Sequence, residues 1–216
     1  MIDISNRKKD IKESLIMRFI RMWSYPITWI FIRTPITPNQ ITFLSFASII
    51  AASILFSFGR YEYILIGGVF VWLSIILDLV DGEVARIKNK VSTFGKWFDG
   101  TLDRVGDTMV LAGMSIGVYV QNPSVWIVVL GLFATFSTLL WRHIALLKII
   151  TFNLPVESER PYKTIGFDVG MQYFIITMGA LTNQLFFVLM FFAVMINMAW
   201  IKNILLTIIR SKHNQK

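Results

Sequence analysis

The chain has 216 residues, 55% of them hydrophobic, and the apolar residues occur in long runs. A mean hydropathy of +0.63 excludes an ordinary soluble domain and predicts an all-α polytopic membrane protein. The absence of cysteine excludes disulfides and Cys-ligated metals. The net charge of +8 is interpreted as basic cytoplasmic loops rather than as a nucleic-acid site.

Residues 1–33 predict an N-terminal amphipathic helix lying in the membrane interface. Arg18 and Arg21 interrupt the apolar part, which argues against a cleavable signal peptide. At about 100° per residue, one face collects Leu15, Ile16, Phe19, Ile20 and Trp23, and the other collects Ser14, Arg18 and Arg21. We expect Pro26 to end or bend this helix.

Residues 34–216 predict one membrane domain of six transmembrane helices. The expected spans are about 40–58, 63–80, 92–120, 125–150, 169–182 and 185–201. Pro35 and Pro38 predict a shaped turn before the first span, with Thr37 or Asn39 as its cap. Under this plan every Lys and Arg except Arg60 lies on one side. That bias predicts a cell-membrane protein with both termini and the aspartates cytoplasmic.

Four aspartates lie within one stretch, DLVDGEVARIKNKVSTFGKWFDGTLD, which runs from residue 78 to residue 103. Asp78 and Asp81 share a stripe of the second expected span, and Asp99 and Asp103 share a stripe of the third. A short connection makes these helices antiparallel neighbours, so the stripes can face each other. Small residues at 82, 85 and 95 leave the surface between them bare for a ligand.

Four neighbouring carboxylates need counter-charge, and two divalent cations would supply it. Oxygen ligands without Cys or His favour a hard metal, which we expect to be Mg²⁺, with Mn²⁺ or Ca²⁺ as substitutes in binding. Two such ions suit displacement at phosphorus. The simpler interpretation, solvated caps at helix ends, does not explain four aspartates on two stripes. Asp107 continues the second stripe and either contacts the ligand or supports Arg104 or a neighbouring helix.

The pattern D-x2-D-G-x2-A-R-x8-G-x3-D-x3-D resembles the motif of the CDP-alcohol phosphotransferase (CDP-alcohol phosphatidyltransferase) family. It is matched at eight positions: Asp78, Asp81, Gly82, Ala85, Arg86, Gly95, Asp99 and Asp103. The TPNQIT stretch and the six-span plan extend the resemblance over most of the chain. The residues in and around the motif are most similar to those of the branch of di-myo-inositol phosphate phosphate synthases. Members of this branch often carry a fused cytidylyltransferase. We expect no such domain in these 216 residues, and another enzyme to supply the CDP-substrate.

The resemblance implies transfer of a substituted phosphate from a CDP-linked alcohol to an acceptor hydroxyl, with release of CMP. It implies that Asp78, Asp81 and Asp99 hold metal against the diphosphate, and that Asp103 joins a second metal and acts as base. The implied nucleotide-binding residues are Asp78, Gly82, Ala85, Arg86, Gly95 and Asp99. Thr37, Asn39 and Thr42 are candidates for a turn beside this pocket. The implied assembly is a homodimer in membrane lipid.

The donor and the acceptor stay open at this stage. The donor is a CDP-diacylglycerol or CDP-archaeol lipid, or soluble CDP-inositol. An acceptor such as inositol phosphate or glycerol phosphate would require cations, for which the candidates are Arg104, Arg142, Lys148, Arg160 and Lys163. His143 fits an interfacial or packed residue better than a ligand.

Two hypotheses from other classes are a divalent-cation transporter and a membrane scaffold. Transporter carboxylates usually lie near the midplane on broken helices, often with internal repeats. Here they gather at one membrane face, and no repeat is visible. A scaffold gives no reason for an eight-position motif.

Overall fold

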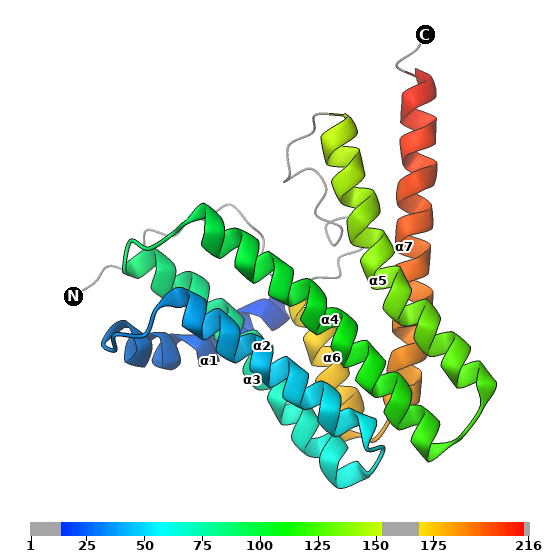
Figure 1. The fold of residues 1–216 in the computed structure, drawn as a ribbon, viewed down its shortest axis with the longest axis horizontal. Coiled ribbons are helices and arrows are strands. Elements are labelled where there is room, and N and C mark those ends of the chain that lie inside the picture. Colours follow the sequence, from blue (N-terminus) through cyan, green and yellow to red (C-terminus); the bar gives the residue numbers. More distant parts are fainter. Residues whose placement is uncertain (1–13, 153–168, 214–216) are drawn as a thin grey trace.

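The computed structural model describes residues 14–152 and 169–213, and all regular elements in these ranges are α-helices (Figure 1). They are α1 (Leu15–Ile32), α2 (Pro38–Ser57), α3 (Tyr61–Ile87), α4 (Thr93–Gln121), α5 (Val125–Thr151), α6 (Val169–Leu181) and α7 (Leu185–His213). The helices fall where the hydropathy pattern predicts them. The helices α3 and α7 extend further than expected, to Ile87 and His213.

Among the described residues, α2, α3, α5 and α7 are long and apolar enough to cross a membrane, and α6 is a shorter apolar helix. The prediction of an all-helical membrane protein is therefore confirmed in this coarser form. Helix α4 is less apolar because its first half carries Asp99, Asp103, Arg104 and Asp107. The count of six spans stays a prediction.

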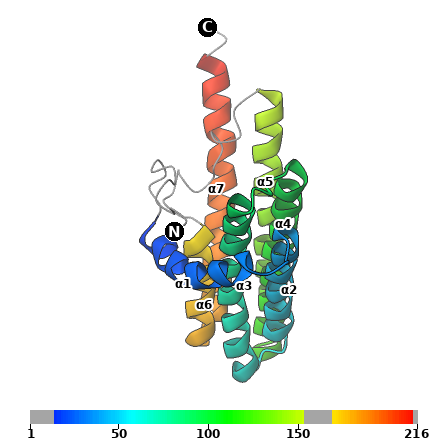
Figure 2. The same cartoon turned by 90° about the vertical axis from the view of Figure 1, so that its left-hand side faces the viewer.

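Helix α1 lies across the bundle, whereas the other helices run roughly along it (Figure 2). It begins at an N-cap, where Ser14 Oγ accepts from the Met17 amide at 3.1 Å. Of the two outcomes expected at Pro26, an end or a bend, the end does not occur, because the helix continues through Pro26 to Ile32. Pro26 and Met22, whose carbonyl loses its usual donor, are both exposed, so the interruption lies on the outer side.

The buried residues of α1 overlap its apolar face only at Ile20. Leu15, Phe19 and Trp23 are exposed, and the side that packs against α3 buries Ile20, Ser24 and Thr28. A side of α1 that carries two hydroxyls is therefore turned into the protein. The large apolar side chains stay on the outside, as expected for a helix lying in an interface.

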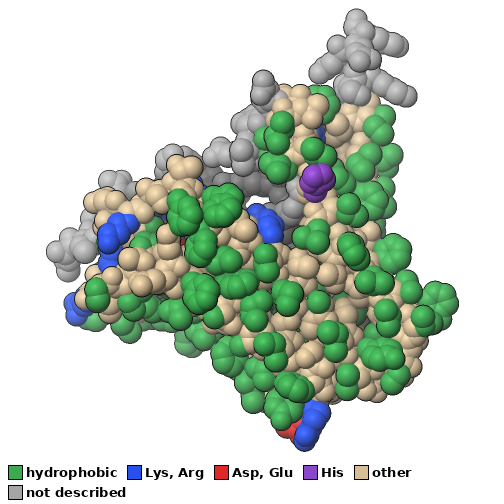
Figure 3. Space-filling model, in the orientation of Figure 1, with side chains coloured by type: hydrophobic (Ala, Val, Ile, Leu, Met, Phe, Trp, Pro, Cys, Tyr) green, Lys and Arg blue, Asp and Glu red, His purple; other side chains and the backbone are tan. Residues whose placement is uncertain are grey.

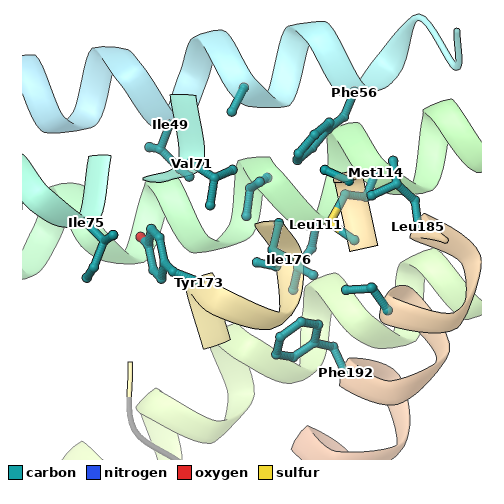
Figure 4. Close-up of a cluster of buried hydrophobic side chains, with 14 of the residues drawn as sticks. Ile49, Phe56, Val71, Ile75, Leu111, Met114, Tyr173, Ile176, Leu185 and Phe192 are labelled. Atoms are coloured by element: carbon teal, nitrogen blue, oxygen red, sulfur yellow. The ribbon is translucent and has the colours of Figure 1, made fainter. Parts of the chain in front are cut away.

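The core lies where α2, α3, α4, α6 and α7 meet (Figure 4). Phe56, Val71, Leu111, Ile176 and Phe192 each come from a different one of these helices and are at most 1% exposed. Their packing fixes the positions of α3 and α4, which carry the aspartates.

Helices α2 and α4 approach each other backbone to backbone. A Cβ atom at Gly113 or Gly117 would overlap the carbonyl oxygen of Ser53 or Phe56, so only glycine permits this distance. Hydrophobic side chains cover much of the outer surface, as Figure 3 shows for one face. Exposed Trp126, Phe133 and Phe136 on α5 are part of it, which suits a lipid environment.

Candidate active site

The turn between α3 and α4 brings the two aspartate stripes together. Asn89 lies in the left-handed conformation with φ 53°, which asparagine tolerates better than most residues. Ser92 then caps α4, because its Oγ accepts from the Gly95 amide at 2.9 Å. A tight reversal with a defined cap sets the register of α4 against α3.

Three of the four motif aspartates share one space. Asp78, Asp99 and Asp103 are half-buried, and one carboxylate oxygen from each lies within 4.8 Å of the others. Carboxylates at such distances repel one another unless cations neutralise them. The facing stripes that the sequence predicts are thus present in the fold.

Asp81 has a different environment from these three. It is 6% exposed, and its Oδ2 accepts from Thr42 Oγ1 on α2 at 2.6 Å. Thr42, which was expected only in a turn beside the pocket, thus makes a direct hydrogen bond to a motif aspartate. Asp81 also lines a cavity together with Asp99.

The residues present fit a divalent cation. Oδ1 of Asp99 is buried and finds no hydrogen-bond partner within residues 14–152 and 169–213. A buried carboxylate oxygen without a donor is costly unless a cation meets it. All the ligand atoms offered here are oxygens, the donors that Mg²⁺ and Mn²⁺ prefer.

A cavity of about 190 Å³ adjoins these carboxylates, at the ends of α2, α3 and α4 that meet at the turn. Among the residues that line it are the motif positions Asp81, Gly82, Ala85, Arg86, Gly95 and Asp99, and also Asn39 and Thr42. Asp78 and Thr37 do not line it. Thr37 is instead the N-cap of α2, with its amide bonded to Gln40 Oε1 at 2.8 Å.

Two glycines keep this cavity open. A Cβ atom at Gly95 would lie 3.0 Å from Ser92 Oγ and 3.2 Å from Asn39 Oδ1, so both side chains would have to shift by a few tenths of an ångström. A Cβ atom at Gly82 would meet only the guanidinium of Arg86, at 3.4 Å or more. The small residue at 82 is therefore explained by the space in the cavity and not by helix packing.

The structure describes only some of the basic residues that are predicted to bind the phosphate of the acceptor. Arg104 is half-buried, with its Nη1 3.9 Å from Oδ2 of Asp103. Lys148 donates to Asn203 Oδ1 on α7 at 3.1 Å, and His143 is exposed. The side chain of Arg142, and Arg160 and Lys163 entirely, lie outside the described residues.

Asp107 lies one turn beyond Asp103 and turns toward α6. Its Oδ1 is 3.5 Å from both Gln172 Nε2 and the Tyr173 hydroxyl, two buried residues. Of its two expected roles, support of a neighbouring element is the one that these contacts fit. The polar pair on α6 was not predicted, although a glutamine in an apolar helix is a signal worth following.

Comparison with known proteins identifies the class. The sequence model of the CDP-alcohol phosphatidyltransferases matches residues 35–207. The chain belongs to this family, as its motif predicts.

Two relatives within this family are similar to part of the chain. The chain is 39% identical over 84 residues to a bifunctional IPC transferase and DIPP synthase from Rubrobacter xylanophilus, covering 39% of this chain and 19% of the relative. It is 34% identical over 100 residues to an archaetidylinositol phosphate synthase from Pyrococcus horikoshii, covering 44% of this chain and 50% of the relative. The chain thus spans half or less of the length of these relatives.

Solved structures of phosphatidylinositol phosphate synthase from Mycobacterium tuberculosis share the fold. The apo form matches with a TM-score of 0.66 and 21% identity, covering 82% of this chain and 92% of that one. A second structure of that enzyme has CDP-DAG bound, and matches with a TM-score of 0.64 and 20% identity over 83% of this chain and 90% of that one.

Proposed function

We propose that this chain transfers a substituted phosphate from a CDP-linked alcohol to the hydroxyl of an acceptor alcohol, with release of CMP and dependence on Mg²⁺. The observation that carries the proposal is the cavity of about 190 Å³ lined by motif residues, next to three carboxylates within 4.8 Å of one another. Family membership supports the same reaction.

In this proposal the aspartates hold two metal ions and Asp103 is also the base. Asp78, Asp81, Asp99 and Asp103 would hold the ions, which when bound neutralise a diphosphate and polarise the phosphorus. Asp103 suits proton abstraction because its side chain is 41% exposed and an acceptor hydroxyl can reach it. The acceptor hydroxyl gives its proton to Asp103 and its oxygen bonds to the phosphorus, while the bond from that phosphorus to the bridging oxygen breaks and CMP leaves with this oxygen.

The cytidine and diphosphate would occupy the cavity. Gly82, Ala85 and Gly95 present little side chain there, and Arg86 also lines the cavity as a cation for phosphate. Asn39 and Thr42 close the cavity from α2.

A lipid-linked donor is favoured over soluble CDP-inositol. An apolar hollow of about 520 Å³ adjoins the cavity at Asn39 and is otherwise lined by Ile36, Gln40, Phe43, Leu44, Phe94 and Phe98. Such a surface accommodates hydrocarbon better than a polyol. The solved structure with CDP-DAG bound supports the same choice.

The acceptor is proposed to be a phosphorylated polyol, with inositol phosphate ahead of glycerol phosphate. The name of the archaetidylinositol phosphate relative supports this order. Arg104 and Lys148 are its described candidate cations, and the others are Arg142, Arg160 and Lys163. We further propose a homodimer in the cell membrane, as the family resemblance implies. The bias of Lys and Arg supports an orientation with the site and both termini cytoplasmic.

The test is a panel of donors and acceptors with the purified protein in lipid nanodiscs. CDP-diacylglycerol, CDP-archaeol and CDP-inositol are each combined with inositol 1-phosphate, inositol or glycerol 3-phosphate, and CMP and product are measured with and without EDTA. We expect CMP release with a CDP-lipid and inositol phosphate, abolished by EDTA and restored by Mg²⁺. Activity that survives EDTA would overturn the metal assignment. Metal uptake into liposomes without CMP release would favour a transporter.

A further inference from the structure

Glu83 is a buried carboxylate on α3, two residues after Asp81, and the proposed reaction does not use it. It is 1% exposed. Its oxygens accept from Thr28 Oγ1 at 2.6 Å and from Arg21 Nη1 at 3.0 Å. Ser24 Oγ lies 3.4 and 3.5 Å from the two oxygens. These three donors come from one side of α1, at spacings of three and four residues.

A second contact ties α3 to the end of α1. Lys88 Nζ donates to the carbonyl oxygens of Phe31, Thr34 and Ile36 at 3.1, 2.7 and 2.9 Å. These are the last turn of α1 and the segment that leads to α2, where carbonyls without helical partners attract a cation. Helix α3 therefore holds α1 by a carboxylate and the following turn by an ammonium group.

The same turn leads back to the metal-binding side of α3. It ends at the Thr37 cap of α2, and one turn later Thr42 Oγ1 donates to Asp81 at 2.6 Å. Contacts therefore run in a closed circuit from Glu83 through α1, the turn and α2 to Asp81. A shift of α3 against α1 would stretch the bond between Thr42 and Asp81.

The site tolerates little movement of this kind. Its carboxylates come from two helices, and the oxygens of Asp78, Asp99 and Asp103 lie within 4.8 Å. Metal ligation requires positions held to about half an ångström. A buried carboxylate with its donors adds little net stability over apolar packing, but it accepts only a narrow range of positions. A side chain of this kind is suited to fixing the position of α3 along α1.

We propose that Glu83 is a positioning residue: its bonds to α1 fix the position of α3 so that Asp78 and Asp81 face Asp99 and Asp103. This inference rests on the proposed function, since it assigns to those aspartates the binding of metal. It gives α1 a role in the reaction that lies beyond contact with the membrane interface.

Thr28 offers the sharpest test because it lies on α1 and contacts the carboxylate of Glu83 directly. Thr28→Val keeps the shape and removes the hydroxyl, while Thr28→Ser keeps the hydroxyl and is the matched control. Mn²⁺ binding to the full-length protein in nanodiscs is followed by electron paramagnetic resonance, and CMP release is measured against Mg²⁺ concentration. Helix content and melting temperature are measured for each variant.

We expect Thr28→Val and Glu83→Gln to raise the Mn²⁺ dissociation constant and the half-saturating Mg²⁺ concentration roughly tenfold or more. Thr28→Ser should stay within about twofold of the wild type, because it keeps the donor. A lower melting temperature with unchanged Mn²⁺ affinity would overturn the proposal and leave Glu83 a purely structural residue. Equal effects of Val and Ser at position 28 would also overturn it.

The outcome for the wild type separates this inference from the proposed function. A wild type that binds Mn²⁺ but releases no CMP from any donor contradicts the proposed reaction, while the Mn²⁺ comparison still decides the role of Glu83. A wild type active on CDP-lipid whose Thr28→Val and Glu83→Gln variants behave identically to it contradicts only the role of Glu83.

Discussion

The carboxylates on the two sides of α3 have opposite environments. On the side that faces α1, Glu83 is 1% exposed and accepts from Arg21 and Thr28. On the side that faces α4, Asp78 shares a space with Asp99 and Asp103, and Oδ1 of Asp99 finds no donor in the described part of the chain.

The partners of a buried carboxylate therefore indicate whether it has a structural or a ligand-binding role. A carboxylate whose oxygens meet hydroxyls and a guanidinium has its charge compensated within the protein and suits fixing a position. Carboxylates that crowd other carboxylates, beside a cavity, keep ligand capacity for something from outside. Substitutions on the two sides should therefore affect different measurements.

The largest effect is expected from Asp103→Asn, which removes the proposed base and keeps the shape of the side chain. CMP release should fall by roughly 10²–10⁴-fold, while binding of the CDP-substrate, measured by calorimetry, stays within a few-fold. Glu62→Gln is the control, because Glu62 is exposed at the other end of α3 in a pair with Arg60 at 3.6 Å and such pairs contribute little. Near-normal turnover in Asp103→Asn would remove the base from the scheme.

The cavity gives the second prediction. Gly82→Leu should occupy the space of the cytidine while leaving α3 intact, because a Cβ there meets only the flexible Arg86. Overpacking a filled site costs about 1–3 kcal/mol, so KM for the donor should rise about 5- to 150-fold. Gly100→Leu is the matched control, since a Cβ at Gly100 meets nothing within 4 Å. If both variants bind the donor equally well, the nucleotide does not occupy this cavity.

The sequence alone predicted the helices and the facing stripes because both depend on local rules. A spacing of four residues puts Asp99 and Asp103 on one side of a helix, and the short connection at 88–92 forces the helices side by side. The spacing of the motif residues is therefore enough to predict that the stripes face each other, without knowledge of any long-range contact.

The contacts of Glu83 could not be predicted in this way. Arg21 and Thr28 are separated from it by 62 and 55 residues, and their meeting depends on how α1 crosses α3. The apolar pattern of α1 pointed to its outer face and gave no sign that Ser24 and Thr28 would be buried. A charged residue in an apolar helix was the available signal, but it does not indicate which helix supplies the donors.

The third prediction concerns Asp81, which combines features of both sides: it lines the cavity but has a donor from the protein. Thr42→Val should lower metal affinity or activity roughly 10- to 100-fold, as loss of a bond to a ligating carboxylate usually does. Ser45→Ala is the control, because Ser45 Oγ also joins α2 to α3, at the carbonyl of Ser74 and 2.9 Å, but touches no aspartate. Equal Mg²⁺ dependence in the two variants would mean that Asp81 does not hold metal.

The smallest effect is expected from Asp107→Asn, the same change as Asp103→Asn one turn further along α4. The Oδ1 of Asp107 lies 3.5 Å from Gln172 and Tyr173, at the long end of hydrogen bonding, and an asparagine oxygen can still accept there. Because the accepting oxygen is kept, the change should cost only about 0.5 kcal/mol, so CMP release and the half-saturating Mg²⁺ concentration should change about twofold. A loss as large as that of Asp103→Asn would instead assign Asp107 to the ligand-binding carboxylates. The group of carboxylates that binds the ligand would then extend one turn further along α4.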